Sequence, residues 1–252
     1  MNMLGLLYSI ASYGLFLATF AYFAVFCGGV FLPKTVDSGT SASVAVSTTI
    51  NLTLILLFGL QHSIMARASF KRALTRIIPP ALERATYVLA SSLALIHLMW
   101  QWHPWPSVIW HVDNAPAVAA LWSLNALGWL GVPVSSLFID HFDLFGVKQA
   151  LHAFRRTTFD RKGFVTPLLY KYFRHPMMTT LMVGLWVTPH MTTGHALLSL
   201  GMTVYILIGV HFEERALAKE FGAEYHRYQA TTPKFLPIGI SRLPIKPATQ
   251  KP

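Results

Sequence analysis

Two groups of polar residues in the C-terminal half of the chain have the side chains needed to bind a charged, aromatic ligand. The first group precedes an apolar run and comprises Tyr170, Tyr172, Arg174, His175 and Pro176. The second follows the next apolar run and comprises Glu213, Glu214 and Tyr225. A helix that begins with a proline has free amides that can bind a carboxylate, and a guanidinium can do the same. Carboxylates bind ammonium or ribose hydroxyls, and aromatic rings stack on a purine. The two groups therefore predict a site for a zwitterionic ligand with a ribose and a purine. The alternative is that Arg174 and the glutamates only pair with one another.

The elements that carry these residues are predicted to be membrane helices. Of the 252 residues, 54% are hydrophobic and only 12% are charged, which is unlike a soluble domain. A helix crosses the hydrocarbon core with roughly 17 to 25 apolar residues. Apolar runs of this size lie at about 4–32, 44–66, 85–102 and 115–139. We therefore expect an all-α integral membrane protein with four transmembrane helices.

After the fourth run, the sequence predicts a helical hairpin. The apolar run 176–187 is short, TPHMTTGH at 188–195 is a turn, and 196–212 is apolar again. The hairpin either crosses as two thin spans or stops partway, so the total is five to six spans. A cytoplasmic amphipathic helix is expected over 213–228. We divide the chain into a four-span bundle with a substrate pocket (1–140), a ligand-binding segment with the hairpin and the cytoplasmic helix (141–236), and a basic tail (237–252).

The positive charges predict the orientation. All 20 Lys and Arg except Lys34 fall in 67–84, 148–174 and 215–251, beside apolar runs or after the last one. Because basic loops stay on the cytoplasmic side, the N-terminus, the C-terminus and both polar groups are expected there. The net charge of +10 could suggest nucleic-acid binding, but no aromatic motif is interleaved with the basic residues. The lipid bilayer is the expected partner, with no nucleic acid and no obligatory protein partner.

Several long motifs resemble a known group of enzymes. GFVTPLLYKYFRHPMMTT at 163–180 and HFEERALAKEFGAEYHRYQATTPKFLP at 211–237 together resemble the C-terminal signature of the isoprenylcysteine carboxyl methyltransferase superfamily. Three further stretches are similar to the bacterial methanethiol S-methyltransferase family: Tyr13 to Gly39, which ends FLPKTVDSG, LFGLQHSIMAR at 57–67 and PPALERATYVL at 79–89. This resemblance implies transfer of a methyl group from S-adenosyl-L-methionine to methanethiol, a small volatile thiol, in a bacterial inner membrane. Dimethyl sulfide and S-adenosylhomocysteine would be the products, and the two polar groups above would line the cofactor site.

A thiol acceptor would also need a group that favours its thiolate, because free thiols ionise near pH 8.5. His62 is the first candidate for this base, and Gln61 and His62 are the candidate substrate contacts, because this polar pair interrupts an apolar run. Without such a role, His62 would be a core histidine bonded across helices. The second candidate is His141, with Asp143 to orient its imidazole. A metal that binds and deprotonates the thiol is a further alternative, with His62, His141, Asp143 and His211 as its ligands. These residues lack the close spacing of metal ligands, so no metal is predicted.

Two other functions remain open from the sequence. The first is a methyltransferase for a larger lipidic thiol or carboxylate, which predicts a lateral opening to the lipid. The second is an NnrU-like accessory or transport protein in which histidines hold haem or conduct an ion, and it predicts no cofactor site at the hairpin.

Overall fold

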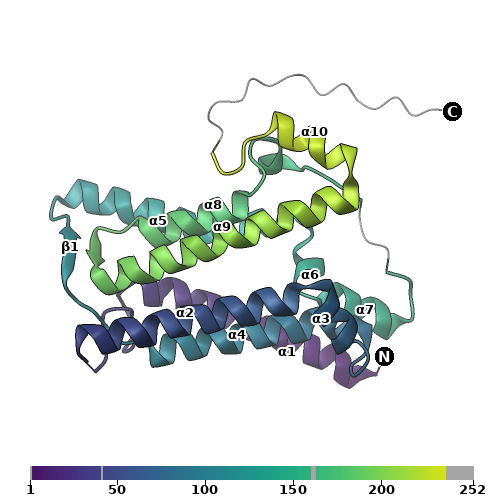
Figure 1. The fold of residues 1–252 in the computed structure, drawn as a ribbon, viewed down its shortest axis with the longest axis horizontal. Coiled ribbons are helices and arrows are strands. Elements are labelled where there is room, and N and C mark those ends of the chain that lie inside the picture. The colour runs from purple at the N-terminus through teal and green to yellow at the C-terminus, as the bar shows by residue number, and fades with distance from the viewer. Residues whose placement is uncertain (1, 41, 160–162, 237–252) are drawn as a thin grey trace.

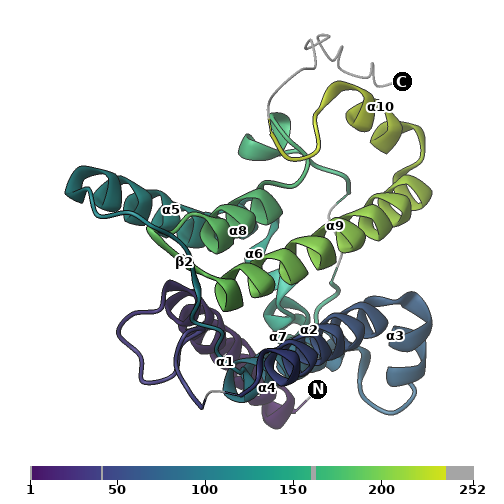
Figure 2. The same ribbon diagram turned by 60° about the vertical axis from the view of Figure 1, so that its left-hand side comes forward.

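The computed structural model describes residues 2–40, 42–159 and 163–236, and within them the long helices form two layers. One layer consists of α1 (Met3–Gly28), α2 (Val44–Ala66) and α4 (Glu83–Gln101). The other consists of α5 (Ala115–Ile139), α8 (Pro176–Trp186) and α9 (Thr193–Phe221) (Figures 1 and 2). The shorter helices are α3 (Ala68–Leu74), η1 (Pro80–Leu82), α6 (His141–Leu144), α7 (Val147–Arg155), η2 (Leu168–Lys171) and α10 (Ala223–Thr231). The predicted basic tail at 237–252 lies outside the described residues.

The expected all-α membrane fold is confirmed. Among the described residues, four helices are long and apolar enough to cross a membrane, namely α1, α2, α5 and α9. The predicted third span is present as α4, which has 19 residues and packs between α1 and α2. The second arm of the predicted hairpin is α9, whose 29 residues extend well beyond the expected 196–212.

The prediction of one amphipathic helix over 213–228 is wrong. Helix α9 continues to Phe221, and Gly222 then adopts φ 54° and ψ −127°, a conformation that favours glycine. Helix α10 begins at the next residue and turns back over the end of α9 (Figure 1). The break matters because it folds the aromatic residues of α10 towards the start of α8.

Helices α5 and α8 approach one another very closely because small residues face each other. A Cβ atom on Gly128 would lie 2.5 Å from the backbone nitrogen of Gly184, and one on Gly131 would lie 2.6 Å from the side chain of Thr180. Asn125 donates from Nδ2 to the carbonyls of Gly184 (2.9 Å) and Val187 (2.7 Å). Small residues and interhelical hydrogen bonds of this kind hold membrane helices together.

A two-stranded antiparallel sheet joins two distant segments. Strand β1 (Val108–His111), in the link between α4 and α5, pairs with β2 (His190–Thr192) at the tip of the α8–α9 hairpin. The sequence predicts a turn at the hairpin tip and no strand in the link, so both strands are additions to that prediction. The pairing holds the hairpin tip at the same end of the molecule as the α4–α5 link (Figure 1).

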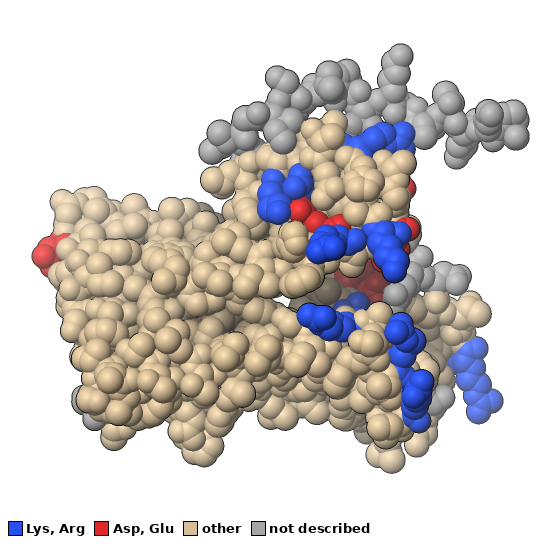
Figure 3. Space-filling view, in the orientation of Figure 1, with Lys and Arg blue, Asp and Glu red and all other residues tan. Residues whose placement is uncertain are grey.

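The opposite end is hereafter the basic end. Lysines and arginines gather there on both sides of a hollow between the two layers, with acidic residues at its edge (Figure 3). Towards the middle of the molecule the layers close on aromatic contacts. Phe23 of α1 meets Trp129 of α5 with ring centroids 5.6 Å apart, and Phe58 of α2 meets Tyr205 of α9 at 5.8 Å. The polar groups predicted from the sequence therefore surround a space that opens at the basic end.

Candidate functional site

A cavity of about 220 Å³ lies between the start of α8, the end of α9 and α10. It brings together residues from Ile139 to Tyr228, which are 89 positions apart in the sequence. Its lining is polar on one side and aromatic or aliphatic on the other: Ile139, Gly163, Phe164, Val165, Tyr170, Arg174, His175, Met177, Met178, Glu213, Leu217, Phe221, Tyr225 and Tyr228. Five of the eight residues predicted for the cofactor site line this cavity, and they are Tyr170, Arg174, His175, Glu213 and Tyr225.

Glu214 is held by three cationic or imidazole groups. Its Oε1 accepts from Nε of Arg174 (2.7 Å) and is 3.1 Å from Nε2 of His175, and its Oε2 is 3.0 Å from Nζ of Lys234. Arg174 also donates to the carbonyls of Gln229 (3.0 Å) and Thr232. This buried cluster fastens α8, α9 and the segment after α10 together. Glu214 is not among the lining residues, and the sequence did not single out Lys234.

Glu213 is in a different position from its neighbour. Its side chain is 52% exposed and lines the cavity, and the nearest basic atom is Nδ1 of His175 at 3.8 Å. Its carboxylate therefore keeps lone pairs that can accept hydrogen bonds from a ligand. Of the two adjacent glutamates, Glu214 therefore makes structural contacts and Glu213 faces the cavity.

Aromatic rings form the other side of the cavity. Phe164 contacts Phe221, Tyr225 and Tyr228, with ring centroids 5.3–5.6 Å apart. The hydroxyl of Tyr228 donates to the carbonyl of Tyr170 (2.5 Å), which fixes α10 over η2. Burial raises the pKa of Tyr225 to about 12, so its phenol is neutral at physiological pH. The sequence reasoning missed Phe164, although its place in the GFVTP motif and its aromatic ring were available as signals.

The start of α8 differs in part from the prediction. The amides of Arg174 and His175 donate to the carbonyls of Pro233 (2.9 Å) and Lys234 (3.1 Å), so these two donors are used within the chain. Pro176 is the first residue of α8, as expected. Tyr172 is 46% exposed and is not among the lining residues. Burial lowers the pKa of His175 below its ordinary value, which favours the neutral imidazole beside Arg174 and Lys234.

His62 belongs to a second polar group, between α2, α4 and α9. Its Nδ1 is 3.0 Å from the hydroxyl of Ser91 on α4, and its ring contacts those of Tyr87 (4.8 Å) and Tyr205 (5.9 Å). Gln61 donates to the sulfur of Met65 (3.1 Å), and its Oε1 is buried without a hydrogen-bond partner among the described residues. His62 is thus bonded across helices, as the alternative reading anticipated, with Tyr87 and Tyr205 close by.

His141 is held by residues other than the predicted aspartate. Its Nε2 lies 2.6 Å from the hydroxyl of Tyr13 and its Nδ1 lies 2.6 Å from that of Ser136. Asp143 instead accepts from Nε2 of Gln149 (2.6 Å), so the expectation that Asp143 orients His141 is wrong. Burial lowers the pKa of His141, which favours a neutral ring. In the part of the chain that the structure describes, no group of three or more metal-ligating side chains forms.

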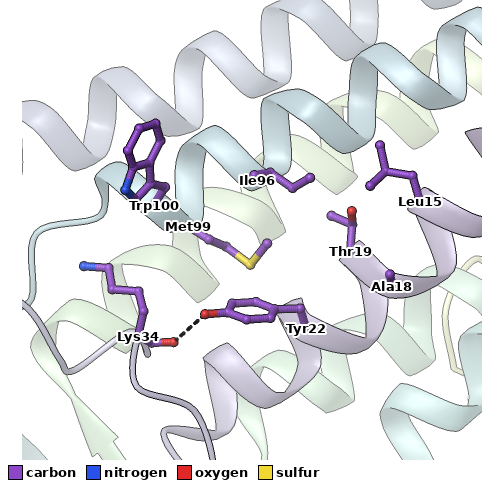
Figure 4. Close-up of a pocket in the computed structure, with 8 residues that line it drawn as sticks. All are labelled: Leu15, Ala18, Thr19, Tyr22, Lys34, Ile96, Met99 and Trp100. Carbon is purple, nitrogen blue, oxygen red and sulfur yellow. Dashed lines mark hydrogen bonds between the residues drawn. The ribbon is translucent and has the colours of Figure 1, made fainter.

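A further cavity lies between α1 and α4 and has a different character. Its lining is almost wholly apolar, and Lys34 is the one charged residue among the eight shown in Figure 4. The hydroxyl of Tyr22 donates to the carbonyl of Lys34 (3.2 Å; Figure 4). Tyr22 and Trp100 supply aromatic rings, but none of the eight residues has the carboxylate that a zwitterionic nucleoside needs.

The fold and the site together define an integral membrane protein with a polar ligand cavity at its basic end. Comparison with known proteins narrows this class. The chain is 44% identical to the methanethiol S-methyltransferase of Mycobacterium tuberculosis over 234 residues, which cover 93% of this chain and 96% of the relative. It is 46% identical to the methanethiol S-methyltransferase of Pseudomonas deceptionensis over 233 residues, which cover 92% and 89% of the two chains. The chain therefore belongs to the methanethiol S-methyltransferase family.

A more distant similarity extends to animal proteins. The chain is 32% identical to Nurim of Bos taurus over 181 residues, which cover 65% of each chain. No protein-family model and no solved structure matches the chain.

Proposed function

We propose that this membrane protein transfers a methyl group from S-adenosyl-L-methionine to methanethiol and releases dimethyl sulfide and S-adenosylhomocysteine. The observation that carries the proposal is the agreement between the family and the cavity. Relatives named methanethiol S-methyltransferase match more than nine tenths of the chain, and the cavity at its basic end has the donor set that the methyl donor requires.

The residues of the cavity fit the parts of that donor. Glu213 offers a carboxylate, more than half exposed, for the ribose hydroxyls or the ammonium group. Arg174 offers its guanidinium, already oriented by Glu214, for the carboxylate. Phe164 and Tyr225 offer ring faces and edges for the purine. When bound, S-adenosyl-L-methionine supplies an electrophilic methyl group, so the protein mainly has to position the thiol and exclude water.

The remaining predicted residues take supporting parts in the proposal. Tyr170 lines the cavity, and Pro176 is the first residue of α8, whose Met177 and Met178 also line it. His175 and Glu214 hold Arg174 in place. Tyr172 does not line the cavity and has no part in this assignment.

The thiol is proposed to bind between the two layers, next to the cavity. The ring of His62 contacts those of Tyr87 and Tyr205 there, and Gln61 precedes it on α2. His141 is two residues after Ile139, which lines the cofactor cavity. Of the predicted catalytic residues, His62 and His141 are retained as candidates, and Asp143 supports the α6–α7 corner through Gln149.

We further propose that the basic end faces the cytoplasm of a bacterial cell and that the chain lies in the inner membrane. The described lysines and arginines other than Lys34 lie at this end, as the positive-inside rule requires of a cytoplasmic face. The cofactor cavity then opens to the compartment that contains S-adenosyl-L-methionine.

The decisive experiment uses the purified full-length chain in detergent with methyl-labelled S-adenosyl-L-methionine and methanethiol. We expect labelled dimethyl sulfide in the headspace and S-adenosylhomocysteine in solution in equal amounts. Calorimetry should show S-adenosyl-L-methionine binding to the wild type and much weaker binding to Glu213→Gln. Absence of both product and binding would refute the proposal, and binding with methylation of a lipidic thiol alone would refute the substrate.

A further inference from the structure

A chain of three hydrogen bonds links α1, α6 and α5 at the basic end. The hydroxyl of Tyr13 meets Nε2 of His141 at 2.6 Å, and Nδ1 of His141 meets the hydroxyl of Ser136 at 2.6 Å. Ser136 in turn donates to the carbonyl of Pro133 at 2.7 Å. Tyr13 lies 128 residues from His141 in the sequence.

The direction of each hydrogen bond follows from the donor inventory. A hydroxyl has a single proton, and that of Ser136 is committed to the carbonyl of Pro133. Ser136 must therefore accept from His141, which places the imidazole proton on Nδ1. The other nitrogen, Nε2, then carries a lone pair and accepts the proton of the Tyr13 hydroxyl. The Tyr13 oxygen keeps lone pairs that can accept a hydrogen bond from a further donor. Nε2 of His141 is the base that can accept the Tyr13 proton.

The backbone next to His141 is strained, and this strained conformation sets the direction of the His141 side chain. The preceding residue, Asp140, has φ 93° and ψ 74°, a region that residues other than glycine rarely adopt. Such a conformation is unfavourable by itself and persists where the surroundings enforce it. Here Lys148 holds the Asp140 carboxylate at 2.5 Å, and Gly146, with φ 85°, closes the corner. The result is that His141 is directed back between the layers, where it is only 7% exposed.

The surroundings of Tyr13 suit a small apolar thiol. Its ring is in contact with Phe16, Phe142 and Phe145, with centroids 5.8–6.5 Å apart. Helix α6 lies between the two layers in both ribbon views (Figures 1 and 2). Ile139, two residues before His141, lines the cofactor cavity.

The other candidate base is arranged differently. Ser91 lies 3.0 Å from Nδ1 of His62 and 3.5 Å from the amide nitrogen of Gln61. A hydroxyl oxygen can accept two hydrogen bonds, so Ser91 can accept from Gln61 and either accept from Nδ1 of His62 or donate to it. Unlike those of His141, these contacts do not assign the proton of His62 to one ring nitrogen.

We propose that Tyr13 is the group that accepts the thiol proton, with His141 receiving the proton that Tyr13 gives up. The inference rests on the proposed methyl transfer. The S–H proton passes to the Tyr13 oxygen while the Tyr13 proton passes to Nε2 of His141, which leaves a thiolate, a neutral phenol and an imidazolium. The thiolate sulfur forms a bond to the methyl carbon as the bond from that carbon to the sulfonium sulfur breaks, so the negative and positive charges cancel. His141 then returns a proton through Tyr13 to water.

The test compares Tyr13→Phe with a matched variant on the same helix. Tyr8→Phe also removes a phenol that bonds across helices, in this case to Thr86 (3.0 Å). At pH 7 we expect Tyr13→Phe to lower kcat/KM for methanethiol by roughly 10²–10⁴-fold, as for loss of a general base, and Tyr8→Phe to change it by less than about threefold. Both variants should bind S-adenosyl-L-methionine as the wild type does.

The pH profile separates proton transfer from a structural effect. Because a thiol ionises by itself at high pH, the rate of Tyr13→Phe should rise about tenfold per pH unit and approach the wild-type rate near the pKa of the thiol. Ser136→Ala, which removes the acceptor of the Nδ1 proton, should show a smaller loss with the same recovery.

Wild-type activity in Tyr13→Phe would overturn the inference, and so would a loss that is equal at every pH. A His62→Ala variant that alone recovers at high pH would also overturn it. If the wild type produces no dimethyl sulfide, the proposed function fails first and the inference fails with it.

Discussion

At the scale of single residues, the adjacent glutamates of α9 show how one helix separates two functions. Successive residues on a helix point about 100° apart, so Glu214 turns towards Arg174, His175 and Lys234 while Glu213 turns towards the cavity. One carboxylate stabilises the site and the other remains available for a ligand.

This division predicts opposite results for two conservative substitutions. Glu214→Gln leaves buried cations without their partner, so we expect it to lower the free energy of unfolding by about 3–5 kcal/mol. Glu213→Gln should leave the melting temperature within a few degrees of the wild type and weaken S-adenosyl-L-methionine binding at least tenfold. Thermal denaturation in detergent and calorimetry of the same samples measure both effects. If Glu213→Gln had a lower melting temperature than the wild type and bound S-adenosyl-L-methionine with wild-type affinity, the two roles would have to be exchanged.

The sequence identified most of the polar side chains of the site, because charged residues beside membrane runs are conspicuous. It could not tell Glu213 from Glu214, since that distinction depends on Lys234, which reaches the cluster only after α10 has folded back. It also could not find Tyr13 or Ser136, because aromatic and hydroxyl residues are ordinary inside membrane helices. The orienting partner chosen for His141 was wrong for a related reason: Asp143 is close in sequence, but the helical turn of α6 points it towards Gln149.

At the scale of helices, the contact between α5 and α8 has the least room for change. Gly128 faces the backbone of Gly184, and Gly184 faces the ring of Trp129. The sequence showed these glycines but not which helices they join. The sequence also did not show that the predicted helix over 213–228 would be interrupted at Gly222. A glycine is tolerated inside a helix, and only the packing of α10 against the rest of the protein makes the chain turn there.

We therefore expect Gly128→Ala to separate α5 from α8 and to destabilise the protein by about 1–3 kcal/mol, as overpacking does. Gly209→Ala in α9 is the matched control, because a Cβ atom there meets nothing within 4 Å. It should leave the stability unchanged or raise it by up to about 1 kcal/mol, the usual helix preference for alanine. Differential melting of the two variants measures the contrast, and equal melting temperatures would contradict the close contact.

At the scale of the whole molecule, the all-α membrane fold followed from hydropathy and charge. What the sequence left open was whether the α8–α9 hairpin crosses fully. The pairing of β2 with β1 holds the tip of the hairpin beside the α4–α5 link, so we expect a full crossing.

A full crossing can be checked by labelling single cysteines in a Cys27→Ala background. Asp113→Cys marks the α4–α5 link, Thr193→Cys the hairpin tip, and Lys219→Cys the basic end. In sealed vesicles of known orientation, a membrane-impermeant maleimide should modify the first two from one side and the third from the other. Modification of the tip and of Lys219→Cys from the same side would show that the hairpin turns back within the membrane.

The same short sheet has a consequence for biogenesis. Strand β1 leaves the ribosome before α5 and β2 leaves it after α8, so their pairing cannot form until both of these helices have been inserted. A chain halted before residue 192 would leave the edge of Val108–His111 without its partner strand. The sheet therefore forms only after α5 and α8, whereas α9 still follows it in the chain.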